Sequence, residues 1–261
     1  MGTPGLALGQ IKIAFCILGG DITTQIGYTS RPAEANMQTG SDRPAKNKIQ
    51  IPYAQIEYTG TFKVPIVKAF APPTGIIENL LRALKPHGFS IDGVEARSRE
   101  KATDCAVELR RALPVTSFKV TPAKIVVTAD NPDWSNREKL IETVKTGLHA
   151  VLGLEHSELE SQLFVLAMHV QLQDKPRKEI TAPLLSTTAY ELLSGDSEFQ
   201  GIVLTRIGVS VVIDASNVHA NALFVRLVRE HKPTTTIDQI ADQLYADETH
   251  IFEVLGLDGE L

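Results

Sequence analysis

The chain has 261 residues, of which 43% are hydrophobic and 22% are charged, and its formal net charge is −5. These values exclude a chain that is disordered throughout, and they leave room for a sizeable core. The acidic balance disfavours a nucleic-acid partner, because neutralising phosphates supplies most of the affinity of such binders. No apolar run reaches the roughly 18 residues of a membrane helix, so we expect no membrane partner. The two cysteines cannot form a disulfide framework, and we expect a soluble cytoplasmic protein.

The first part of the chain differs in composition from the rest. Residues 21–48 are rich in Thr, Ser, Gly, Pro and Asn, and their apolar residues show almost no periodicity. Such a composition is typical of loops and linkers. The sequence therefore predicts a poorly structured N-terminal extension over residues 1–48 and a single domain over residues 49–261.

Strands dominate the first half of the predicted domain. Gly60 interrupts an alternating run and predicts a hinge between two strands. Thr74 is a suitable N-cap for the helix that follows, and the alternation changes phase at Pro122, which predicts either one bulged strand or a tight hairpin. The elements expected here are two strands within 49–70, a helix within 72–88, and strands within 89–98, 103–113 and 117–130.

The second half predicts longer elements and a helical end. Apolar residues recur every three to four positions over 132–152, which predicts a helix. Within residues 161–173 the odd-numbered and the even-numbered positions are both largely apolar, so both faces of a strand would be covered, and this predicts a central strand. After Asp214 the pattern predicts helices alone, with a C-terminal helical segment at about 218–257. The remaining elements expected are a helix within 181–195, a strand within 201–213, and helices within 220–232 and 236–261.

The order of these elements indicates the fold class. Strands that follow one another through short turns pair antiparallel, and strict strand–helix alternation is missing. The sequence therefore predicts an α+β fold: a largely antiparallel sheet with helices packed on one side and a helical C-terminus.

The stretch "VVIDASNVHANALF", residues 211–224, carries the candidate site residues Asp214 and His219. "VVIDASN" resembles the first strand of PIN and NYN nuclease domains, in which acidic residues at strand ends hold Mg²⁺. This resemblance implies a metal-dependent hydrolase or nuclease in which Asp214 is joined by Asp130 or Asp133. The motif normally begins such a domain, whereas only 47 residues follow Asp214 here. We favour the alternative, a polar turn whose Asn217 caps a following helix.

The C-terminal sequence "TIDQIADQLYADETHIFEVL" has the outline of a helix-turn-helix motif, with Tyr245 or Ala246 at the turn. A recognition helix needs basic side chains to approach DNA phosphates. From residue 235 onward the chain has no Lys or Arg and seven acids: Asp238, Asp242, Asp247, Glu248, Glu253, Asp258 and Glu260. The pattern therefore favours an amphipathic helix that packs on the sheet or on a partner protein.

Signatures of catalysis and cofactor binding are missing from the sequence. It has no Gly-rich phosphate loop, no Walker lysine, no GxSxG motif and no His pair at metal-ligand spacing, so we expect no cofactor and no metal. The leading hypothesis is a non-enzymatic module that binds a protein partner or forms a homo-oligomer. It is motivated by the acidic C-terminus and by the proline-marked strand near residue 65, which has the character of an edge.

Overall fold

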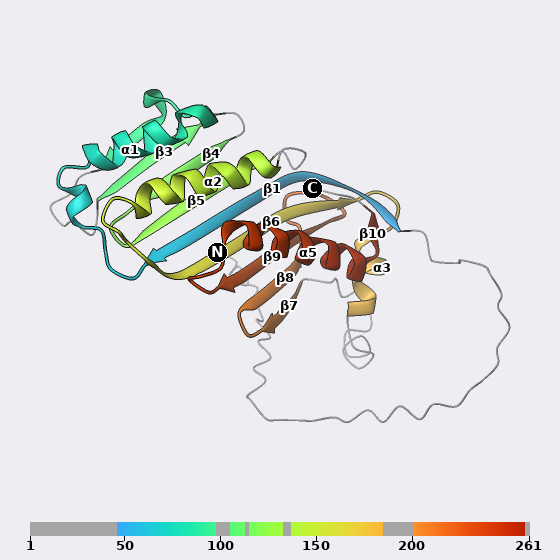
Figure 1. The fold of residues 1–261 in the computed structure, drawn as a ribbon. Helices are drawn as coiled ribbons and strands as arrows, with labels where there is room; N and C mark the ends of the chain where they lie inside the picture. Colours follow the sequence, from blue (N-terminus) through green and yellow to red (C-terminus); the bar gives the residue numbers. More distant parts are fainter. Residues whose placement is uncertain (1–45, 98–104, 113–114, 133–136, 185–200, 259–261) are drawn as a thin grey trace, which may run out of the picture. The chain divides into compact units, whose positions relative to one another are not determined.

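The computed structural model of the protein describes residues 46–97, 105–112, 115–132, 137–184 and 201–258 (Figure 1). The buried apolar residues among them form one continuous hydrophobic core. The described helices are α1 (Thr74–Leu84), α2 (Arg137–Leu152), α3 (Arg177–Thr181) and α5 (Ile237–Leu255). The described strands are β1 (Asn47–Phe62), β2 (Val94–Arg97), β3 (Ala106–Arg111), β4 (Thr116–Val120), β5 (Lys124–Asp130), β6 (Leu159–Leu172), β7 (Gly201–Arg206), β8 (Val209–Ala215), β9 (Ala222–His231) and β10 (Leu257–Asp258).

The described strands form one sheet in the order β2-β3-β4-β5-β1-β6-β9-β8-β7. Every neighbouring pair along this order is antiparallel, and β10 adds a short parallel pairing with β1. The long strands β1 and β6 lie at its centre. The predicted α+β class with a largely antiparallel sheet is therefore confirmed.

The helices cover one face of this sheet. Figure 1 shows α1, α2 and α5 side by side on the same face. On β1 the buried residues Ala54, Ile56 and Tyr58 point toward these helices, and the alternate residues point to the other face. Each helix buries one apolar stripe against the sheet, including Ile76 of α1 and Ile240 of α5. The prediction of helices on one side is confirmed, and we call the opposite face the open face.

The predicted helical C-terminus is also confirmed, as the single helix α5. Thr236 and Gln239 form a reciprocal capping box at its start, and Gly256 closes it with a φ of 62°. The helix is continuous through Tyr245 and Ala246, so the helix-turn-helix outline is wrong. None of the helices in the described ranges is long and apolar enough to span a membrane.

The predicted helix within 220–232 is wrong, because these residues form strand β9. The helical segment therefore begins at Ile237 and not near residue 218. Alternate residues Leu223, Val225 and Leu227 are buried, and β9 pairs with β6 on one side and β8 on the other. A strand with two partners satisfies its backbone hydrogen bonds through them, which outweighs the weaker helical pattern.

Three smaller predictions need correction. Residues 201–213 are the two strands β7 and β8, which turn at Gly208 with a φ of 74°. Gly60 lies inside the continuous strand β1, and Pro73, not Thr74, is the N-cap of α1. The hairpin alternative at Pro122 is confirmed by β4 and β5. The predicted helix within 181–195 is described only to Leu184, as the end of α3 and a short 3-10 turn; the rest lies outside the described residues.

Candidate functional site

A row of aromatic and titratable side chains crosses the open face from β8 to β1. Asp214 of β8 lies opposite Phe224 of β9, Phe224 lies opposite His169 of β6, and His169 lies opposite Tyr53 of β1. Cross-strand partners in an antiparallel sheet share a face, and these positions alternate with the buried residues of their strands. The register of four strands therefore gathers them, and we call this set the His169 row.

His169 contacts Phe224 of the row and two residues of the turn that follows β8. Its Nδ1 lies 3.0 Å from the Ser216 Oγ. Its ring centroid lies 5.1 Å from that of Phe224 and 5.5 Å from that of His219. Burial lowers the pKa of His169, and the positive charge that His219 can carry lowers it further. The imidazole is therefore held in its neutral form at neutral pH.

The Ser216 hydroxyl makes hydrogen bonds to two backbone N–H groups and to His169. Its oxygen accepts hydrogen bonds from the backbone N–H groups of Val218, at 3.2 Å, and His219, at 3.1 Å. Its one proton is then directed to His169 Nδ1, which leaves the imidazole proton on Nε2. Ser216 thus builds the turn after β8 and orients the His169 ring.

This turn corrects one sequence interpretation. We predicted that Asn217 caps a helix after Asp214. The turn is instead built around Ser216, and it joins strand β8 to strand β9. Asn221 supports the return with a φ of 48°, and its side-chain amide donates to the carbonyl groups of Leu172 and Lys175. A tight strand-to-strand connection needs such a residue, because few side chains tolerate positive φ.

At the β1 end, Asp130 accepts two hydrogen bonds. The Tyr53 hydroxyl donates to its Oδ1 at 3.1 Å, and the Gln55 amide donates to the same oxygen at 2.7 Å. Burial raises the pKa of Tyr53, and so do its hydrogen bond to Asp130 and the charge of that carboxylate. Asp130 therefore anchors the neighbouring strand at this end of the open face.

At the β8 end, Asp214 lies against the edge strand β7. Its carboxylate occupies the space beside Gly201, where a Cβ would overlap Oδ1, so a larger residue at position 201 would displace the carboxylate. Burial raises the pKa of Asp214. The carboxylate is thus partly removed from water, and burial is the cause of its raised pKa.

The sequence singled out Asp214, Asp130, Asp133 and His219, and the structure does not gather them into one site. Four strand spacings separate β8 from β5, which places Asp214 and Asp130 roughly 19 Å apart along the sheet. His219 lies beside His169, and Asp133 is outside the described residues. In the described ranges no three residues among His, Cys, Asp and Glu are grouped closely enough to hold a metal ion.

Sequence reasoning missed Tyr53, His169 and Ser216. Each lies on a different segment, and only the pairing register places them together. The row gathers half-buried aromatic rings and hydrogen-bonding groups on the open face of the sheet. No protein-family model matches the chain, and no curated protein is similar to it.

Proposed function

We propose that the protein is a non-enzymatic association module that pairs through the edge strand β7, with a second copy of the chain as its simplest partner. The observation that supports this proposal is the contrast between the two ends of the sheet. β2 and β7 are the terminal strands in the described order. An edge strand presents unpaired N–H and C=O groups, and proteins that stay monomeric protect such edges.

The β2 edge carries the usual protection. It has four residues, and Glu95 and Arg97 stand exposed on it. Arg110 of the neighbouring strand lies 3.4 Å from Glu95, so charges of both signs gather there. Short length and charge both oppose pairing with another strand.

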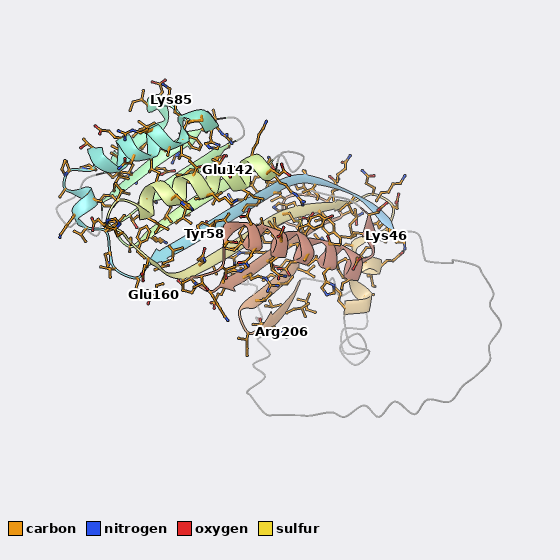
Figure 2. The ribbon with its side chains drawn as sticks, in the orientation of Figure 1. Lys46, Tyr58, Lys85, Glu142, Glu160 and Arg206 are labelled. Carbon is orange, nitrogen blue, oxygen red and sulfur yellow. The ribbon has the colours of Figure 1, made fainter. Side chains whose placement is uncertain are left out.

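The β7 edge has the opposite character. It has six residues, and its Val203 and Leu204 side chains are 62% and 47% exposed. Neighbouring residues of a strand point to opposite faces, so both sides of this edge are apolar. Ile207 in the adjoining turn is fully exposed, and the single charge on the strand is Arg206 at its end (labelled in Figure 2). In the described ranges no strand pairs with the outer side of β7.

Antiparallel pairing of two β7 strands would satisfy these groups in a symmetric way. Each copy contributes the same strand, which is the arrangement of a closed twofold dimer. Main-chain hydrogen bonds would join the two sheets, and Val203 and Leu204 would leave water. The open face with the His169 row would then extend across both copies.

The sequence suggested association through the acidic C-terminus or through the proline-marked strand near residue 65, and our proposal uses β7 instead of either. Pro65 follows β1, which lies at the centre of the sheet with β5 and β6 as neighbours, so no edge lies there. The apolar stripe of α5 is already buried against the sheet. The apolar side of the acidic helix is therefore part of the core, and removing this helix would remove core residues together with any contact it makes.

Light scattering behind size-exclusion chromatography tests the proposal. We expect the mass of the full chain to rise from one copy to two with concentration. Val203→Lys should shift this transition to at least about tenfold higher concentration, because it places a charge on the pairing strand. Ala96→Lys, on the protected β2 edge, is the matched control and should leave the transition unchanged. A monomer at all concentrations, or an equal effect of both substitutions, contradicts the proposal.

A further inference from the structure

A hollow of about 250 Å³ lies between α2 and α5 on the helix-covered face, and it does not involve β7. Its floor comes from the central strands and its walls from the two helices. Tyr58 (labelled in Figure 2) belongs to the floor, and its hydroxyl donates to Gln162 Oε1 at 2.8 Å. The floor residues are Ile56, Tyr58, Val127, Ala129 and Phe164. We call this hollow the α2–α5 slot.

Two contacts bridge the helices and mark the ends of the slot. The Arg137 guanidinium lies 4.9 Å from the ring centroid of Tyr245, and Lys145 Nζ lies 2.7 Å from Asp238 Oδ1. The helices therefore run antiparallel past each other. Arg137 and Lys145 are eight residues apart on α2, a length of roughly 12 Å at the helical rise.

The walls between these bridges are apolar. Leu140, Ile141 and Val144 come from α2, and Ala241 and Leu244 come from α5. Protein interiors are close-packed, and an apolar hollow even smaller than this one admits a ring such as benzene. Among the side chains of the five floor residues, Tyr58 alone carries a polar atom, and its hydroxyl already donates to Gln162. The slot therefore suits an apolar body that makes no hydrogen bonds.

The charged side chains at the rim of the slot favour a ligand of one charge. Arg137, Glu138, Asp238 and Asp242 line it. Lys145 pairs with Asp238, whereas Glu138 and Asp242 have no ion-pair partner in the part of the chain that the structure describes. With Arg137 stacked on Tyr245, two unpaired carboxylates face one guanidinium. The remaining charge at the mouth is negative and complements a cation.

We infer that the α2–α5 slot binds an amphiphilic amine, with its alkyl or aryl body between the helices and its ammonium group at Glu138 and Asp242. An apolar body gains by leaving water, and the ammonium group stays at the solvated rim beside the carboxylates. A carboxylate of the same length would meet like charges there. The slot lies on the helix-covered face, so this binding does not rest on association through β7.

Calorimetric titration with three probes of equal length, octylamine, octan-1-ol and octanoate, tests the inference at neutral pH and below their micelle concentrations. We expect one octylamine per chain, bound at least about fivefold more tightly than octanoate, with octan-1-ol between them. Glu138→Gln combined with Asp242→Asn should remove the preference for the amine and leave octan-1-ol binding unchanged. Equal or tighter binding of octanoate overturns the inference, and so does the absence of binding by all three probes.

Filling the slot is the second arm of this test. Ala241→Phe places a ring between the helices and should abolish binding of octylamine and octan-1-ol. Ala246→Phe adds the same ring at an exposed position of the same helix and should leave binding intact. Ile141→Trp fills the slot from α2 and replaces Ala241→Phe if that variant loses its thermal unfolding transition. Undiminished binding of octylamine to a folded variant with a filled slot overturns the inference.

Discussion

Arg229 of β9 and Asp247 of α5 form a two-point ion pair, in which Nε lies 2.6 Å from Oδ2 and Nη2 lies 2.6 Å from Oδ1. Both side chains are largely covered, being 24% and 13% exposed. The planar guanidinium matches the carboxylate, and this geometry gives the strongest hydrogen bonds between charged side chains. The pair thus fastens the C-terminal helix to the half of the sheet that ends in β7.

Removing this carboxylate should destabilise the fold. We expect Asp247→Asn to lower the free energy of unfolding by about 2 kcal/mol, because it leaves the half-buried Arg229 without its counter-charge. Asp238→Asn is the matched control on the same helix. It removes a partner of Lys145 at a more exposed site and should cost less than about 1 kcal/mol. Urea unfolding measures both, and equal costs would contradict the role given to Arg229 and Asp247.

His169 should make stability depend on pH. Burial lowers its pKa below the ordinary value of 6.5, so the unfolded chain takes up a proton before the folded chain does. Stability from this residue is present above pH 6.5 and is lost as the pH falls through the folded pKa. His169→Gln keeps an acceptor for the Ser216 hydroxyl and removes the titration.

Unfolding at pH 7.5 and pH 5.5 should therefore show a smaller loss of stability for His169→Gln than for the unchanged chain. Burial also lowers the pKa of His231, so part of the loss remains in the variant. His231→Gln is the comparison, since it should remove the other part. If His169→Gln loses as much stability as the unchanged chain, the buried neutral form of His169 is contradicted.

Asp214 should respond to pH in the opposite sense. Burial raises its pKa above the ordinary value of 3.8, so the folded chain holds the proton more tightly and stability falls as the pH rises through the folded pKa. We expect Asp214→Asn to raise the thermal midpoint at pH 7 and to have little effect at pH 3, where the carboxyl is neutral in both states. A lower midpoint at pH 7 would show that the charged form makes a favourable contact.

Gly147 of α2 should resist replacement although it lies in a helix. A Cβ at Gly147 would overlap the ring of Phe118, a fully buried residue of β4. Gly147→Ala should cost about 1–3 kcal/mol by overpacking, against a gain of about 1 kcal/mol in helix propensity. Gly75 of α1 has open space around it, so Gly75→Ala should be neutral or stabilising. Chemical denaturation distinguishes the two, and a stabilising Gly147→Ala would contradict this packing.

The sequence predicts correctly those elements whose apolar residues fit one kind of secondary structure and not the other. α1, α2 and α5 carry apolar stripes that only a helix brings together, and the short run of β6 that is apolar at consecutive positions is typical of a central strand. The sequence predicts a helix where β9 lies because the apolar residues of this segment fit both the helical and the strand period. Leu223, Val225 and Leu227 alternate, while Leu223, Leu227 and Val228 also recur at helical spacing. The partners β6 and β8 decide between these patterns, and a local pattern contains no information about them.

The candidate site depends even more on strand pairing, which a local sequence pattern does not contain. Asp214, Asp130 and His219 could be selected by residue type, but their separation depends on how many strands lie between β8 and β5. The sequence predicts a hinge at Gly60, but a Cβ there would meet Leu159 and the Tyr58 hydroxyl at 3.0 Å, so the glycine permits close packing within β1. The edge character of β7 likewise follows from strand order, since Val203 and Leu204 have the composition of an interior strand.

Amide hydrogen exchange of β7 at low and high protein concentration tests the central claim most directly. If two copies pair through this edge, residues 201–206 should gain protection as concentration rises, whereas residues 94–97 of β2 should not change. Val203→Lys should abolish the gain. Exchange of β7 that is independent of concentration, in a chain whose mass does increase, would contradict pairing through β7.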